Sequence, residues 1–335
     1  MLAMRVASAV CALSLAASTA AGAETVTLRM ATVAPDGTAW ARELKAYARD
    51  SEALSNGEIR IKLYLGGIAG DEAAIPDRMK KGQLDGEMAA VTCERMAPSL
   101  RVLRIPGLIR RRDEATYIID RLRPIVDAEF RKHGYVLTGL AWFGSDIVFT
   151  KTPVRSMDDL KKLRLWIWNL DVVWQAGMHH LGLNVVPLPV DAAGAAYDEG
   201  RIDGLLALPS AALVYQWSAR SRYFIDLPVA AMAGCNFVTT SVFESLSTSS
   251  QTALRQAAAK LNFRISEANG ALEDALIGGL FEKQGVKRQS PSEQFRVIFF
   301  DVAREARDKL PADVVPPALI TQVMGWLSDY RATHR

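Results

Sequence analysis

The sequence predicts an α/β protein organised as two domains, and three observations support this prediction. Short apolar strands alternate with helical segments along most of the chain. The chain has 335 residues, of which 50% are hydrophobic, so it exceeds the usual size of one domain and can bury a sizeable core. Strand-helix alternation is typical of a parallel-rich sheet with ligand sites at the carboxyl ends of its strands.

In the first half of the chain, apolar runs and alternating patterns predict strands, and amphipathic spacing predicts helices. The expected strands are residues 25–32, 59–64, 84–91, 135–143 and 147–150. The expected helices are residues 38–54, a segment that Asp71 caps and that runs to Gly82, and residues 113–133. The glycines at 66, 67 and 70 indicate a turn between the second strand and its helix.

The second half begins with the same alternation and then becomes mainly helical. Strands are expected at residues 163–168, 185–188, 204–208 and 236–240. Helices are expected at residues 171–181, 191–199, 247–281, 292–309 and 317–334. There is no internal repeat or long linker.

The strand at residues 163–168 carries the strongest functional signal. Leu163, Leu165 and Ile167 alternate with Arg164, Trp166 and Trp168, so the two tryptophans share one face with the arginine. A strand face with two tryptophans is stable only when another surface packs against it, because exposed indole surface is unfavourable in water. Two interpretations are open: a domain core or subunit interface, and the aromatic wall of a ligand pocket.

The first 23 residues have the pattern of a secretory signal peptide. Arg5 precedes an apolar run, and Ala21-Gly22-Ala23 forms a small-residue processing site before Glu24. No later segment has the length of apolar sequence needed to cross a bilayer. We therefore expect an exported, soluble protein, located in a bacterial periplasm.

Charge and cysteine content restrict the partners. The net charge is +3, and no basic run is interleaved with aromatic residues, so nucleic acid is not an expected partner. Cys93 and Cys235 remain after the leader, and an oxidising compartment permits their pairing. Because they lie far apart in sequence, spacing does not assign a disulfide, and we expect two buried thiols.

Motifs for catalysis, cofactors and metals are missing from the sequence. It contains no Gly-x-Ser-x-Gly elbow, no phosphate-binding glycine loop and no His-Glu-x-x-His. His179 and His180 are adjacent, and neighbouring helical residues point apart, so a shared metal is not expected. We expect a binding protein without cofactor or metal, and an exported enzyme stays as an alternative.

A set of short motifs resembles one family of binding proteins along nearly all of the mature chain. The motifs are Tyr64-Leu65-Gly66-Gly67, Gly70-Asp71-Glu72, Lys81-Gly82-Gln83-Leu84-Asp85-Gly86, Ile105-Pro106-Gly107-Leu108, Asp159-Leu160-Lys161-Lys162-Leu163, Pro187-Leu188-Pro189 and Gly200-Arg201-Ile202-Asp203-Gly204. In this order they resemble the DctP-like solute-binding proteins of tripartite ATP-independent periplasmic (TRAP) transporters. Each motif is weak alone; their order and spacing together are specific.

The resemblance implies a two-lobe periplasmic binding protein of type II-like architecture, with hinge strands and a long interlobe helix. It suggests one lobe of residues 24–144 plus 232–272, and a second, discontinuous lobe of residues 145–231 plus 273–335. It also implies that the lobes close on a small-molecule ligand and that the closed form docks on the membrane permease.

The chain departs from the family at its key strand. Relatives usually carry Gly-Leu-Lys-Ile-Arg-Val-Pro-Asn, whose arginine binds the ligand carboxylate; here Trp166 takes the arginine position and Trp168 the proline position, while Asn169 matches. Arg164 lies two residues earlier on the same face, which leaves open a carboxylate receptor that uses Arg164. The double-tryptophan form resembles a subgroup linked to hydrophobic, lipid-like ligands and to a periplasmic helical-repeat accessory subunit.

Further candidates for the ligand site follow from strand ends and helix starts. Trp217 and Gln216 either pack or line the site, and Trp142 precedes the place of a second family arginine, where Ser145 and Asp146 stand. Asp171 either caps a helix or contacts ligand. The remaining candidates are Thr92, Cys235 and Asn236 at strand ends and Thr38 at a helix start.

We therefore expect a TRAP solute receptor for an apolar or amphipathic organic ligand. The other alternative is a sensor that docks on a receptor kinase. The expectation of an apolar or amphipathic ligand depends on a cation-poor cavity between the lobes.

Overall fold

The protein contains one mixed sheet that runs through both lobes. The computed structural model describes residues 25–334, and the predicted signal peptide lies outside them. The strands are β1 (Val26–Ala31), β2 (Ile59–Tyr64), β3 (Gly86–Ala89), β4 (Tyr135–Thr150), β5 (Arg164–Trp168), β6 (Asn184–Leu188), β7 (Gly204–Ala207), β8 (Tyr223–Thr239) and β9 (Lys287–Gln289). Their order is β2-β1-β3-β8-β4-β7-β5-β6, and β9 pairs with β8. The α/β class is confirmed.

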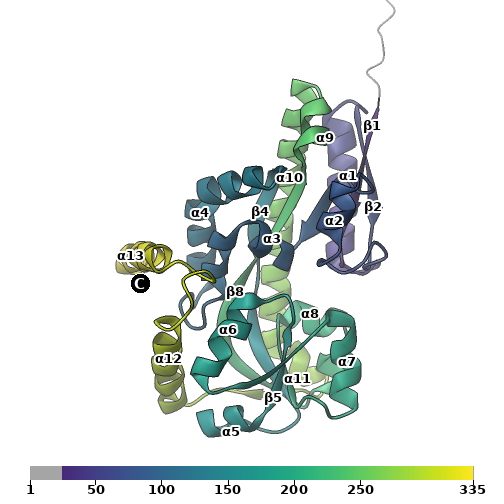
Figure 1. Cartoon of the computed structure of the whole chain (residues 1–335). Coiled ribbons are helices and arrows are strands. Elements are labelled where there is room, and N and C mark those ends of the chain that lie inside the picture. Colours follow the sequence, from purple (N-terminus) through teal and green to yellow (C-terminus); the bar gives the residue numbers. More distant parts are fainter. Residues whose placement is uncertain (1–24, 335) are drawn as a thin grey trace, which may run out of the picture.

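Helices cover the sheet in both lobes (Figure 1). They are α1 (Ala39–Leu54), α2 (Ile75–Lys80), α3 (Val91–Met96), α4 (Arg112–Lys132), α5 (Met157–Lys162), α6 (Val172–Leu181), α7 (Val190–Asp198), α8 (Pro209–Val214), α9 (Thr240–Ser245), α10 (Thr248–Ala275), α11 (Phe281–Lys283), α12 (Glu293–Arg307) and α13 (Pro317–Thr333). Short segments η1 (Pro98–Arg104), η2 (Ser218–Arg220) and η3 (Leu276–Leu280) complete the chain. We call the part around β1–β3 the first lobe and the part around β5–β7 the second lobe.

The two longest strands connect the lobes. β4 and β8 pair antiparallel from Tyr135↔Thr239 to Thr150↔Tyr223, with β3 beside β8 in the first lobe and β7 beside β4 in the second. Three register shifts interrupt the pairing of β4 with β8. Two separate strands were expected at 135–143 and 147–150, and this was wrong, because the backbone continues through the irregular stretch between them as one extended strand.

The long helix also reaches both lobes. α10 packs against α1 and β4, and it continues through the π-helical segment η3 into α11. Leu254 and Leu261 of α10 belong to a first-lobe apolar cluster, whereas Leu276 and Phe281 join a second-lobe cluster. The helix expected at 247–281 is therefore present, with a local irregularity at Gly279, whose φ is 137°.

The C-terminal helix corrects the expected lobe assignment. α12 packs in the second lobe, where Phe295 and Phe299 are buried. α13, however, buries Ile320, Val323 and Leu327 in the same cluster as α4, and Figure 1 shows it beside α4. The sequence could not show this, because an amphipathic pattern does not indicate which core a helix joins. The other expected lobe boundaries stay predictions.

Several local elements differ from the sequence prediction. The strand expected at 84–91 ends at Ala89, and the unpredicted helix α3 begins at Val91. Asp71 does not cap a helix: α2 begins later at Ile75, and the Asp71 carboxylate accepts a hydrogen bond from the Glu72 amide at 2.7 Å. Helix α8 and segment η1 were also not predicted, and both contribute residues to the site described next.

Candidate ligand-binding site

A cavity lies between the lobes and takes its lining from both. Its volume is about 140 Å³. First-lobe residues such as Trp40 and Val91 line it together with Met232 of β8 and second-lobe residues such as Trp168 and Leu208. An apolar cavity of roughly 150 Å³ holds a molecule of the size of benzene, so this space suits a compact ligand.

Aromatic side chains of the second lobe form one wall. Trp166 and Trp217 have ring centroids 4.9 Å apart, and Tyr215 stacks on Trp217 at 5.0 Å. All three line the cavity, as does Trp168, whose indole Nε1 is buried without a hydrogen-bond partner among residues 25–334. Trp166 is 3% exposed, and its Nε1 donates to the Leu188 carbonyl at 3.0 Å. The wall is thus held by core packing and faces the cavity.

The alternation expected for β5 is confirmed. Leu163, Leu165 and Ile167 belong to one second-lobe cluster, whereas Trp166 belongs to another and Trp168 packs against it. The two interpretations of the tryptophans are therefore not exclusive, because the same side chains pack in a core and line a cavity.

A buried guanidinium in the cavity wall was missed in the sequence. Arg104 of η1 donates through Nε and Nη2 to Asp171 Oδ2 at 3.0 and 2.7 Å, and through Nη1 to the Ala231 carbonyl at 3.2 Å. Its Nη2 also lies 2.6 Å from Asp146 Oδ2, and its Nε lies 3.7 Å from Glu94 Oε1. The expected absence of a cation from the cavity is therefore wrong, although this cation already faces three carboxylates of the protein.

We call Arg104, Asp146, Asp171 and Glu94 the Arg104 cluster. Burial shifts the pKa of several of its members. It raises the pKa of Asp146 above its usual value, although Arg104 opposes the shift, and it raises the pKa of Glu94 well above the usual range. Burial lowers the pKa of Arg104, but the three carboxylates outweigh it and leave this pKa above the usual value. The guanidinium stays charged, and the acids outnumber it.

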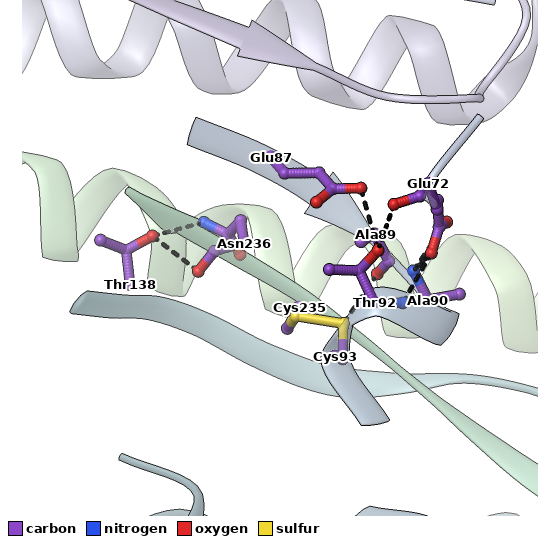
Figure 2. Close-up of a disulfide and its surroundings, with 9 residues drawn as sticks. All are labelled: Glu72, Glu87, Ala89, Ala90, Thr92, Cys93, Thr138, Cys235 and Asn236. Atoms are coloured by element: carbon purple, nitrogen blue, oxygen red, sulfur yellow. Dashed lines mark hydrogen bonds between the residues drawn. A yellow bond between two sulfur atoms is a disulfide. The ribbon is translucent and has the colours of Figure 1, made fainter. Parts of the chain in front are cut away.

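Two further buried acids, Glu72 and Glu87, lie close together in the first lobe (Figure 2). Glu72, which lines the cavity, accepts hydrogen bonds from the backbone amides of Ala90 and Thr92, at 3.0 and 2.8 Å for the shortest contacts. The Thr92 hydroxyl lies 3.2 Å from Glu87 Oε1. Burial raises the pKa of Glu72 to about 7 and raises that of Glu87 well above its usual value.

The raised pKa of Glu72 predicts a pH-dependent contribution to stability. Its folded pKa of about 7 exceeds the usual 4.5, so the native state favours the protonated form and loses stability as pH rises from about 4.5 to about 7. The free energy of unfolding of the wild type relative to Glu72→Gln is expected to fall by up to about 3 kcal/mol over this range. Urea titrations at several pH values measure it, and the exposed Glu267→Gln provides the control. A stability difference between the two proteins that does not change with pH would contradict the raised pKa of Glu72.

Cys93 and Cys235 form a disulfide, which corrects the expectation of two free thiols. Their Cα atoms are 5.9 Å apart, and the bond joins α3 to β8 (Figure 2). Although 142 residues separate them in sequence, the pairing of β3 with β8 places Ala89 opposite Cys235, which brings the start of α3 close to that strand. Cys235 lines the cavity, and so does its neighbour Asn236.

The cavity includes half of the twelve residues predicted for the site. The six that line it are Trp166, Trp168, Asp171, Trp217, Cys235 and Asn236. Of the two roles left open for Asp171, the cap of α6 is present, because its Oδ1 accepts from the Trp174 amide at 3.0 Å, and the residue also lines the cavity. Contact of any of these residues with ligand stays a prediction.

The other six predicted residues do not line the cavity. Arg164 pairs with Asp203 through two contacts of 2.8 Å, and the carboxylate-binding role that the sequence left open for it stays a prediction. Trp142 is buried in the first-lobe core, with Arg112 4.9 Å from its ring. Asn169 and Gln216 are exposed beside the aromatic wall.

Two threonines serve local structure instead. Thr92 is buried, and its hydroxyl contacts the Glu72 carbonyl and the Glu87 carboxylate. Thr38 caps α1 by accepting from the Ala41 amide at 3.2 Å. Tyr215 also lines the cavity but was not predicted to do so. It adjoins the predicted Gln216-Trp217 pair, so its position in the sequence could have indicated its place in the site.

No group of three or more His, Cys, Asp or Glu residues within 25–334 is placed to hold a metal ion. Over the same range, no helix combines the length and the apolar character that a membrane span requires.

Comparison with known proteins gives a consistent family match. The sequence model of "Bacterial extracellular solute-binding protein, family 7" (DctP) matches residues 30–312. A curated "Solute-binding protein" of Chromohalobacter salexigens is 25% identical over 232 residues, which cover 65% of this chain and 65% of that relative.

Solved structures of TRAP periplasmic solute-binding proteins share the fold. One from Desulfovibrio desulfuricans, with bound sn-glycerol-3-phosphate, is 16% identical with a TM-score of 0.83, covering 91% of this chain and 97% of that one. One from Chromohalobacter salexigens, with bound D-glucuronate, is 17% identical with a TM-score of 0.81 and coverages of 89% and 99%. One from Xanthobacter autotrophicus, with bound β-D-galacturonate, is 21% identical with a TM-score of 0.78 and the same coverages. The two-lobe fold expected from the sequence is therefore confirmed.

Proposed function

The chain belongs to family 7 of the bacterial extracellular solute-binding proteins, and from this membership we propose that it is the solute receptor of a TRAP transporter. The family consists of binding proteins, so the chain is not an enzyme. In the proposed mechanism residues 1–23 direct export to the periplasm, the lobes close on a small molecule, and the closed form delivers it to the membrane permease. A helical-repeat accessory subunit is a further proposed partner.

The proposed ligand is an apolar or amphipathic organic molecule. The observation that carries this proposal is the Arg104 cluster: the guanidinium lining the cavity is already held by Asp171 and Asp146. The three solved relatives named above bind anions. In this chain an anion would meet a guanidinium whose contacts are satisfied and two carboxylates that repel it.

The free energies expected for the two kinds of contact favour an apolar ligand over a carboxylate. Burial of about 200 Å² of apolar surface against the aromatic wall would contribute about 5 kcal/mol. A carboxylate buried there without a free cation would instead cost several kcal/mol. Arg164 cannot supply that cation without leaving Asp203, with which it forms a bidentate pair outside the cavity.

The first test identifies the ligand itself. Mature protein purified from its native host under non-denaturing conditions should carry an apolar or amphipathic molecule, which native mass spectrometry followed by denaturing extraction would identify. D-glucuronate added to ligand-free protein should give no binding heat in calorimetry. Recovery of a small dicarboxylate or a sugar acid would contradict the proposal.

Substitutions in the aromatic wall are expected to weaken the recovered ligand. Trp166→Arg places a charge against the apolar wall and should lower affinity about tenfold or more, because it removes apolar contact and desolvates a guanidinium. Trp168→Ala, at the less buried tryptophan, should also lower affinity and disturbs the core less. Calorimetry measures both, and Arg164→Gln on the same strand should leave affinity unchanged. Equal affinity of all variants would exclude the wall from the site.

A further inference from the structure

Acidic side chains outnumber basic ones around the cavity. Glu72, Asp146 and Asp171 line it on the acidic side, and Arg104 is the one basic residue of residues 25–334 that lines it. Glu94 adds a further carboxyl group behind the guanidinium. Glu72 and Glu94 aside, the two aspartates Asp146 and Asp171 face one guanidinium. Buried charges of one sign are costly unless a partner of opposite sign compensates them.

The hydrogen bonds of the Arg104 cluster show where compensation is missing. Asp171 is well satisfied, because Oδ2 accepts two N–H groups of Arg104 and Oδ1 accepts the Trp174 amide. For Asp146, the Oδ2 atom lies 2.6 Å from Arg104 Nη2 as an ion pair and otherwise has no hydrogen-bond partner among the described residues. Asp146 is 2% exposed and lines the cavity. It is therefore a buried carboxylate with acceptor capacity to spare.

Aromatic side chains line the same cavity as these acids. The Asp171 amide donates to the Trp168 carbonyl at 3.0 Å, so the acid follows the tryptophan in a tight turn. Trp168, Trp166 and Trp217 all line the cavity. Indole rings attract cations through their π faces, and they pack equally well on an apolar body. The cavity thus combines a negative edge with aromatic walls.

We infer that the ligand carries a cationic amine, which the buried carboxylate of Asp146 accepts beside the Trp168 ring while an apolar body packs on Trp166 and Trp217. This inference rests on the proposed function and specifies the class of its ligand. The amine supplies the positive charge that the Arg104 cluster lacks, and its N–H groups occupy the open acceptor sites of Asp146. Burial raises the pKa of Asp146 although Arg104 opposes the shift, so the ionised form of this group lacks compensation that a ligand cation would supply.

The test compares three probes that share one apolar body and differ in the head group. Phenethylamine, phenethyl alcohol and hydrocinnamate are titrated by calorimetry into full-length mature protein freed of endogenous ligand. The amine is expected to bind roughly tenfold or more tightly than the alcohol, because a charge-assisted hydrogen bond contributes more than a neutral one, and the carboxylate is expected to bind most weakly.

Two variants test whether Asp146 is the group that causes the preference for the amine over the alcohol. Asp146→Asn should reduce the affinity ratio of amine to alcohol to near unity while the alcohol still binds, and Asp203→Asn, outside the cavity, should keep the wild-type ratio. The wild-type ratio alone decides the inference if Asp146→Asn does not fold.

The outcomes separate the two proposals. Alcohol binding as tight as amine binding would overturn the amine inference and leave the apolar receptor intact. Hydrocinnamate as the tightest probe, or no binding by any probe at millimolar concentration, would overturn the apolar receptor and the amine inference together.

Discussion

Replacement of Arg104 by glutamine is expected to lower the free energy of unfolding by about 3–5 kcal/mol. The guanidinium holds Asp171 and Asp146 at 2.7 and 2.6 Å, and all three side chains are almost completely buried. Glutamine removes the positive charge and leaves the carboxylates uncompensated in the protein interior. The loss of one partner from a buried ion pair costs far more than the net stabilisation by the intact pair, which is why this effect is large.

Urea-induced unfolding at neutral pH measures the effect, and Arg164→Gln is the matched control. Arg164 also forms a bidentate pair with an aspartate, but both side chains of that pair are partly exposed, so its loss should cost only about 0–1 kcal/mol. The deficit of Arg104→Gln should shrink toward acid pH, where the orphaned carboxylates bind protons. Equal losses in the two variants would mean that the Arg104 cluster is solvated and not buried.

Removal of the Cys93–Cys235 disulfide is expected to destabilise the protein by about 2–5 kcal/mol. The bond closes a segment of 142 residues, so the unfolded chain gains much freedom when it is lost. It also attaches α3, which carries Thr92 and Glu94, to the crossing strand β8. Loosening of α3 should therefore disturb both buried acid groups at the cavity.

Denaturant titrations of the wild type and of the double variant Cys93→Ser/Cys235→Ser, each with and without a thiol reductant, measure this effect. The reductant should shift the wild-type midpoint toward that of the double variant and leave the variant unchanged. A thiol count of zero in the unfolded, non-reduced mature protein verifies the bond. Stability that is independent of both reductant and substitution would contradict the expected contribution of the disulfide.

Local patterns were sufficient for most of the strands and for one wall of the site. The alternation of Leu163, Leu165 and Ile167 with Trp166 and Trp168 predicted two faces, and the structure separates those faces into different clusters. This worked because β5 has a different environment on each side, so the period of two is visible in the sequence.

Features that depend on distant segments were not predictable in the same way. Arg104 ends a short 3-10 segment, and its buried charge is compensated by carboxylates from α3, β4 and the N-cap of α6. The disulfide depends on the pairing of β3 with β8, and the position of α13 depends on the apolar face of α4. In each case the decisive contact joins residues whose spacing in the chain carries no periodic signal.

The location of α13 affects how lobe closure can be followed in solution. The first strand begins at Val26 and the last helix ends at Thr333, and both elements belong to the first lobe. Fluorophores placed at these two positions would travel together and report no change on closing. A distance sensor for the proposed closure needs one dye on the first lobe, for example on α4, and the other on the second lobe, for example on α5 or α7.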